Sequence, residues 1–171
     1  MTRTEHKEDY SHLTRPIVTE GLTKAAQNYW IKKVFSTYSE VGMRSKKMGS
    51  LRADVIALSM KREIVICEVK SCWSDFKTDT KWMQYKEYCD KMYFVIHRGL
   101  CDTSKGELII QAAKEQGVGV MRLGTDGKLS VVQNAKRAPM CDKKRDWLIT
   151  KLAWRGGDSR YNNKRVQRVY L

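Results

Sequence analysis

RADVIALSMKREIVICEVK, residues 52–70, predicts two adjacent β-strands around which the rest of the fold is built. Residues 52–58 and 63–69 are apolar runs separated by a short polar turn, and the second run is expected to be buried on both faces. The first run carries Asp54, and the second ends in Glu68, Val69 and Lys70. Because side chains alternate along a strand, Glu68 and Lys70 share one face and Val69 points into the core.

Two carboxylates on neighbouring strands favour a divalent cation that prefers oxygen ligands, Mg²⁺ or Mn²⁺. Asp54 and Glu68 are the candidate metal ligands, and the backbone carbonyl of Val69 is a candidate third ligand. Such an ion polarises a phosphodiester and activates a bound water, and Lys70 can reach that water or the charge that develops on phosphorus. The alternative is that Glu68 and Lys70 form an ordinary surface ion pair at a strand end.

The order of the predicted elements indicates an α/β fold with a central mixed sheet flanked by helices. Periodicity and turn signals predict, in chain order, a helix from residue 14 or 19 to about 35, strands over 37–43, 52–58 and 63–69, a helix over 74–88, a strand over 91–96, a helix over 105–116, a hairpin of 118–123 with 129–132, and a helix over 143–154. We divide the chain into a flexible polar leader, a single domain and a basic tail, which span residues 1–13, 14–154 and 155–171.

The charge of the chain indicates a polyanionic partner. Lys and Arg total 33 and Asp and Glu total 19, which gives a net charge of +14. Nucleic acid explains this excess better than solubility alone, and no long amphipathic basic helix favours a membrane surface. No apolar run is long enough to span a bilayer, so no membrane partner is expected.

The five cysteines indicate a reducing compartment. Their number is odd and no C-x-x-C pair occurs, which favours free thiols over a disulfide framework or a structural metal. The residues at the start of the chain lack the apolar core of a secretory signal. We therefore expect a cytoplasmic protein, in a bacterial cell or in a phage-infected host.

The spacing D-x(13)-E-x-K resembles that of the PD-(D/E)xK nuclease superfamily, whose fold is restriction-endonuclease-like. A longer run is similar to the MmcB-like DNA repair family, which has an Arg-x-Asp strand, a Glu-Val-Lys-Ser strand end and a following Asp-Phe-x-x-Asp-x-Lys-Trp-x-x-Tyr segment. The matching residues here are Arg52, Asp54, Glu68, Val69, Lys70, Ser71, Asp75, Phe76, Asp79, Lys81, Trp82, Tyr85, Cys89 and Asp90. Ala53 stands where the superfamily name has proline.

The resemblance implies roles for individual residues. Asp54 and Glu68 would bind the metal, Lys70 would be the catalytic lysine, and Glu20 would match a supporting acid on the first helix. The alternative for Glu20 is a first-turn residue that the helix dipole favours. Lys81 and Tyr85 occupy the places of a Q-x-x-x-Y motif in RecB-like relatives, with lysine in place of glutamine, and we expect both to face a phosphate. The alternative is a solvated helix face at Lys81 beside a core Tyr85. Trp82 is expected in the core.

DNA contacts are expected from basic residues around this site and from the tail. The candidates are Arg44, Lys46, Lys47, Arg52, Lys77, Lys81, Tyr85, Arg160, Lys164 and Arg165.

The resulting hypothesis is a Mg²⁺-dependent DNA nuclease that acts in DNA repair, recombination or phage DNA processing. The alternative is a DNA-binding accessory protein that keeps the fold without turnover, and an RNA-directed nuclease is a third, weaker reading. DNA is the expected partner, and a homodimer is left open because many relatives cut both strands as pairs.

Overall fold

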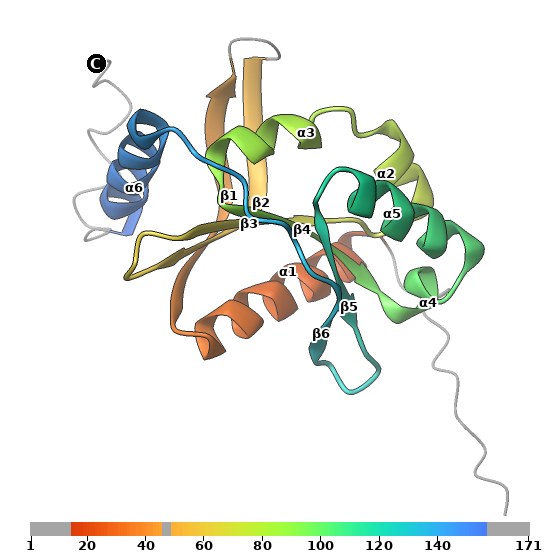
Figure 1. The fold of residues 1–171 in the computed structure, drawn as a ribbon. Coiled ribbons are helices and arrows are strands. Elements are labelled where there is room, and N and C mark those ends of the chain that lie inside the picture. The colour runs from red at the N-terminus through yellow and green to blue at the C-terminus, as the bar shows by residue number, and fades with distance from the viewer. Residues whose placement is uncertain (1–14, 46–48, 157–171) are drawn as a thin grey trace, which may run out of the picture.

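Six strands form one mixed sheet in the computed structural model, which describes residues 15–45 and 49–156 (Figure 1). Their order in the sheet is their order in the chain: β1 Phe35–Ser45, β2 Gly49–Ser59, β3 Ile64–Val69, β4 Lys91–His97, β5 Gly119–Leu123 and β6 Leu129–Gln133. The predicted α/β class is confirmed. The predicted leader lies outside the described residues, as do most of the tail and the candidates Lys46, Lys47, Arg160, Lys164 and Arg165.

The centre of the sheet is parallel and its edges are antiparallel. β3 pairs with β4, and β4 with β5, in parallel, whereas β1–β2, β2–β3 and β5–β6 are antiparallel. Every residue of β3 is buried, as its apolar sequence predicts for a strand covered on both faces. The carboxyl ends of β3 and β4 therefore lie side by side at one edge of the molecule, and the predicted carboxylate site is at this edge.

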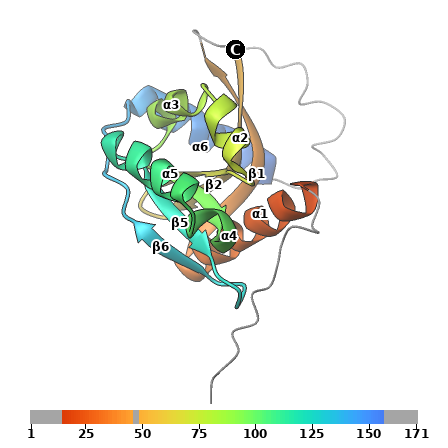
Figure 2. The ribbon, with the colours of Figure 1, turned by 90° about the vertical axis from the view of Figure 1, so that its right-hand side faces the viewer.

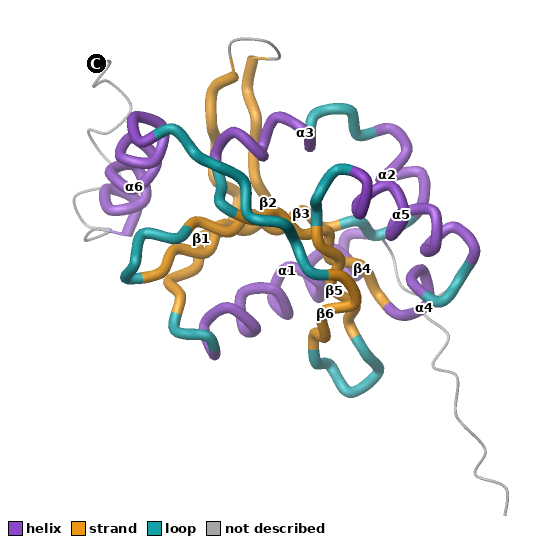
Figure 3. Tube along the Cα trace, in the orientation of Figure 1, coloured by secondary structure: helices purple, strands orange, loops and turns teal. Residues whose placement is uncertain are grey.

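Helices cover both faces of the sheet (Figures 1 and 3). On one face, α1 (Arg15–Lys32) packs Leu22, Ala26 and Trp30 against β2, β3 and β4. The opposite face is covered by α3 (Trp82–Tyr85), the short 3₁₀ helix η2 (Lys86–Tyr88), α5 (Ser104–Glu115) and α6 (Asp142–Gly156). Turned by a right angle, the ribbon shows α1 and α5 on opposite sides of the strands (Figure 2). None of the described helices is both long and apolar enough to cross a bilayer.

The hairpin of β1 and β2 is the longest feature of the sheet and extends past its neighbours as an arm (Figure 1). Its strands are paired from Phe35↔Ser59 out to Ser45↔Gly49, whereas β2 and β3 are paired only from Leu58↔Ile64 to Val55↔Cys67. The outer half of the hairpin is therefore free of β3. Arg44 and Arg52, two of the predicted DNA contacts, lie on this outer half.

The predicted single helix over residues 74–88 is wrong. The structure divides it into α2 (Trp73–Thr78), an extended break at Asp79, α3 and η2. The side chain of Asp79 causes the break, because its Oδ1 accepts the Lys81 N–H at 2.8 Å and so replaces a helical hydrogen bond. A short helix, α4 (Arg98–Cys101), was not predicted, and His97 caps it by accepting the Leu100 N–H.

Candidate functional site

Asp54 and Glu68 lie where β2 and β3 separate. Past the last backbone pair, Val55↔Cys67, each carboxylate accepts a hydrogen bond from the other strand. The Val69 N–H donates to Asp54 Oδ2 at 2.8 Å, and the Asp54 N–H donates to Glu68 Oε1 at 3.2 Å. The two side chains thus take over backbone groups that the opened ladder leaves unpaired. This exchange holds both carboxylates side by side.

The electrostatics of this pair favour a bound cation. Burial raises the pKa of Glu68 well above its ordinary value, and the neighbouring charge of Asp54 raises it further. Burial also raises the pKa of Asp54, although the Val69 N–H and the charge of Lys70 oppose this shift. A divalent cation would replace the missing positive charge and lower both pKa values.

The donor set fits Mg²⁺ or Mn²⁺ better than a metal that needs many protein ligands. Asp54 is only half-buried, whereas Glu68 is 4% exposed. Residues 15–45 and 49–156 contain no group of three His, Cys, Asp or Glu side chains that could hold a metal. Two carboxylates with water and the Val69 carbonyl match an ion that keeps much of its hydration.

Lys70 is buried beside the two carboxylates, and Asp79 holds its ammonium group. Lys70 Nζ lies 2.5 Å from Asp79 Oδ2, and Lys70 and Glu68 are each only 4% exposed. The surface ion pair considered as the alternative is therefore wrong. Asp79, which the sequence analysis names only among the residues that match the family, joins the α2–α3 break to the end of β3. No local signal marked it as the partner of Lys70, because the two meet only after the chain folds back.

Tyr85 holds the backbone of β2 rather than an open position for phosphate. Its hydroxyl donates to the Arg52 carbonyl at 2.9 Å and accepts the Arg52 N–H at 3.3 Å, and its ring is buried. The predicted phosphate-facing role of Tyr85 does not fit this geometry. Trp82 lies in the core as predicted, with its ring edge-on to Phe94. Both aromatic residues of α3 therefore have a packing role: Tyr85 holds the strand that carries Asp54, and Trp82 packs on β4.

Glu40 is a third acidic residue near the pair, and the sequence did not single it out. It lies between the paired positions Ser39↔Val55 and Val41↔Ala53, opposite Asp54, and its φ of 54° interrupts the ladder. Its carboxylate pairs with Arg52 at 2.7 Å, and its charge acts to raise the pKa of Asp54. A left-handed non-glycine residue is uncommon, and its place opposite a candidate ligand marks a constrained position.

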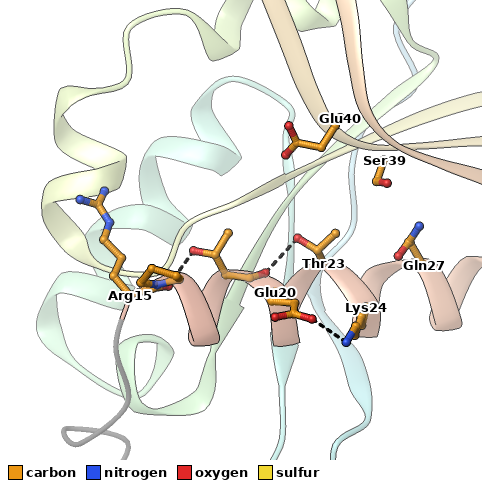
Figure 4. A pocket seen from close by; sticks show the side chains of 9 residues that line it. Arg15, Glu20, Thr23, Lys24, Gln27, Ser39 and Glu40 are labelled. Carbon is orange, nitrogen blue, oxygen red and sulfur yellow. Dashed lines mark hydrogen bonds and ion pairs between the residues drawn. The ribbon is translucent and has the colours of Figure 1, made fainter. Parts of the chain in front are cut away.

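Glu20 lies beside a groove between α1 and β1 (Figure 4). The groove is lined by Arg15, Pro16, Thr19, Glu20, Thr23, Lys24, Gln27, Ser39 and Glu40. The Glu20 carboxylate points toward Lys24, and Glu20 Oε1 lies 2.6 Å from Lys24 Nζ on the exposed side of the helix. This structure therefore does not bring Glu20 to Asp54 and Glu68, and its supporting role stays a prediction.

The remaining described candidates for DNA contact are exposed. Arg44, Arg52, Lys77 and Lys81 all present their side chains to solvent, on the hairpin arm and on the α2–α3 segment. They come from two elements, the β1–β2 hairpin that carries Asp54 and the α2–α3 segment that follows β3. Their binding role is an expectation that the geometry permits.

Comparison with known proteins places this arrangement in a family. A sequence model described as DNA repair protein MmcB-like matches residues 18–144, which include the whole candidate site. No curated protein matches the chain. Among solved structures, a protein of unknown function from Silicibacter pomeroyi is similar with a TM-score of 0.63 and 25% identity over 77% of this chain and 81% of that chain. The predicted family resemblance is confirmed.

Proposed function

Since the chain belongs to the MmcB-like DNA repair family, we propose that it is a metal-dependent DNA nuclease of the PD-(D/E)xK superfamily. It would hydrolyse phosphodiester bonds during DNA repair, recombination or phage DNA processing. The observation that carries the proposal is the opened β2–β3 ladder, where Asp54 and Glu68 stand side by side with raised pKa values and Lys70 lies buried next to them.

The proposal gives each residue of the site a separate role. Asp54 and Glu68, with the Val69 carbonyl, would hold Mg²⁺ or Mn²⁺. When bound, this ion would polarise the phosphodiester and activate a water molecule. Lys70 presents one positive charge to the oxygens that become more negative as the bond breaks. Asp79 fixes the position of that ammonium group, and Tyr85 fixes the strand that carries Asp54.

A DNA-binding accessory protein is the second candidate. It is favoured by the net charge of +14, since cationic residues bind DNA without a metal. The retained set of Asp54, Glu68 and Lys70 favours the nuclease, since binding alone requires neither buried carboxylate. Metal-independent binding of DNA without turnover would select the accessory protein.

The test is cleavage by the full-length chain of single-stranded, duplex and branched DNA, and of RNA of the same sequence, with Mg²⁺ or Mn²⁺. We expect cleavage of at least one DNA substrate by wild type and loss of it in Asp54→Ala and Lys70→Ala. Asp126→Ala is the matched control, because this aspartate is exposed in the β5–β6 turn. The nuclease proposal is wrong if wild type cleaves none of the substrates, or if both site variants cleave as fast as the control.

A further inference from the structure

Helix α6 carries two exposed tryptophans on one face. Trp147 is 43% and Trp154 is 62% exposed, and seven residues separate them, which places both on the same side about 10 Å apart along the helix. The opposite side of α6 is anchored in the core by Leu148 and Leu152. Residues 145–156 lie beyond the segment that matches the family. These tryptophans are therefore a feature of this chain outside the family match.

The same face is positively charged. Lys151 lies between the tryptophans, with its Nζ 5.2 Å from the centre of the Trp147 ring. The charges of Arg155 and of Arg44 on the hairpin arm both act on Lys151. Together with burial, these two arginines lower the pKa of Lys151. Three cations are thus gathered beside two exposed aromatic rings.

This face is joined to the candidate active site. Arg155 donates to the Glu40 carbonyl at 2.9 Å, and the Glu40 side chain pairs with Arg52. Glu40 stands opposite Asp54 on the neighbouring strand, as described above. Figures 1 and 2 both show the end of α6 next to β1. A ligand lying on α6 and crossing Arg155 would therefore arrive at the carboxylates.

We propose that Trp147, Lys151, Trp154, Arg155 and Arg44 form a binding surface for single-stranded DNA that leads a strand into the site. Exposed aromatic rings stack on bases, which a single strand presents and a duplex hides, and cations between the rings contact its phosphates. The identity of the ligand as DNA rests on the proposed function; the presence of the surface does not. Duplex DNA would contact the cations alone and gain nothing from the tryptophans.

The experiment measures binding of fluorescein-labelled oligothymidylate of about 16 nucleotides, in EDTA so that cleavage is absent. For the full-length Trp154→Ala variant we expect the Kd for this strand to rise about fivefold to a hundredfold, the range for loss of one base–aromatic stack. Trp154→Tyr should restore most of the affinity, and affinity for a blunt duplex should stay unchanged. Because Trp154 is mostly exposed, the variant should fold, and its thermal unfolding checks this.

A matched pair of lysine variants tests the phosphate contacts. Lys151→Ala should reduce the slope of log affinity against log salt concentration by about 0.7, whereas Lys114→Ala, an exposed lysine on α5, should leave it unchanged. The proposal is overturned if Trp154→Ala binds the strand as wild type does, or if it loses strand and duplex binding equally. It is also overturned if Trp154→Ala changes only the molar mass in sedimentation, which would make this face a contact between copies of the chain. Strand binding without any cleavage in Mg²⁺ would overturn the nuclease and leave this surface standing.

Discussion

Glu68 and Asp90 are both buried carboxylates, and they lie at opposite ends of the same parallel strand pair. Asp90, just before β4, accepts two hydrogen bonds from Arg145 at 2.7 and 2.9 Å and one from the Ile64 N–H at 2.8 Å. Burial alone would raise its pKa, but these donors outweigh burial and lower it. Glu68, near the end of β3, shares its space with Asp54, and the nearest ammonium group belongs to Lys70, which Asp79 already holds.

This difference in partners and pKa indicates a structural role for Asp90 and a functional role for Glu68. Asp90 has its countercharge inside the protein and anchors α6 to the turn between β2 and β3, since Arg145 also donates to the Arg62 carbonyl. Glu68 and Asp54 share the charge of Lys70 with Asp79, and this charge does not offset their burial, which costs stability unless a cation is added. Buried charge that is not offset inside the protein is a mark of a functional site.

The largest expected effect is at Asp90. Asp90→Ala should lower the free energy of unfolding by about 3–5 kcal/mol, because it leaves the half-buried Arg145 and the buried Ile64 N–H without their acceptor. Urea unfolding measures this loss. Asp102→Ala is the control: Asp102 pairs with Arg98 and Arg122 on the surface, and its loss should cost less than about 1 kcal/mol. Equal losses in both variants would mean that Asp90 is not the anchor.

Glu68→Gln should affect activity rather than stability, the opposite of Asp90→Ala. We expect metal-dependent cleavage to fall about a hundredfold to a thousandfold, roughly 3–4 kcal/mol in activation free energy, because a ligand is lost. The free energy of unfolding should stay equal or rise, because the repulsion between Glu68 and Asp54 is removed. Cleavage rates with Mg²⁺ and urea unfolding of the same preparation measure both quantities. A variant as unstable as Asp90→Ala would show that Glu68 is structural as well.

Asp79→Ala should reduce cleavage about tenfold to a hundredfold, since Lys70 loses the group that positions it. Asp79→Asn separates two roles of this residue, because an amide can still accept the Lys81 N–H while it lacks the charge. We expect Asp79→Asn to keep the α2–α3 break, seen as unchanged stability, and to share the loss of rate. Wild-type rates in both variants would place Lys70 outside the reaction.

The two ends of the strand pair should also differ in the sign of their pH dependence. The raised pKa of Glu68 means that the folded protein holds a proton which the unfolded chain releases, so this group lowers stability as pH rises above about 4.5. The lowered pKa of Asp90 has the opposite effect: its contribution is present above about 3.8 and is lost as pH falls through the lowered value.

Unfolding measured across this pH range should show the Glu68 contribution as a slope of at most about 1.4 kcal/mol per pH unit for one proton. Glu68→Gln or added Mg²⁺ should flatten that slope. A slope that neither treatment changes would mean that Glu68 does not titrate in this range.

Tyr85→Phe should have the smallest effect, a loss of about 1 kcal/mol in the free energy of unfolding as the bond to the Arg52 carbonyl disappears. The salt dependence of DNA binding should not change. A reduced salt slope with unchanged stability would instead restore Tyr85 as a phosphate contact.

The strands and most helices of this protein could be predicted because their signals are local. The apolar run at residues 64–66 marks a buried strand, Gly117 with φ of 69° follows the helix predicted over residues 105–116, and Gly127 turns the β5–β6 hairpin. The break at Asp79 was missed because an apolar pattern continues on both sides of it. The extended backbone of Asp79 and its hydrogen bond from Lys81 show that the helix stops there.

The primary structure alone accounts for the α/β class, the acidic pair and its lysine, because alternation along a strand and spacing between strands need only neighbouring residues. The partners of these groups required the tertiary structure. Asp90 meets Arg145 across 55 residues, Tyr85 meets Arg52 across 33, and Arg155 meets Glu40 across 115. Such contacts depend on how distant elements pack. Only the folded chain therefore shows that Asp90 has its positive partner in Arg145, whereas the charge near Glu68 does not offset its burial.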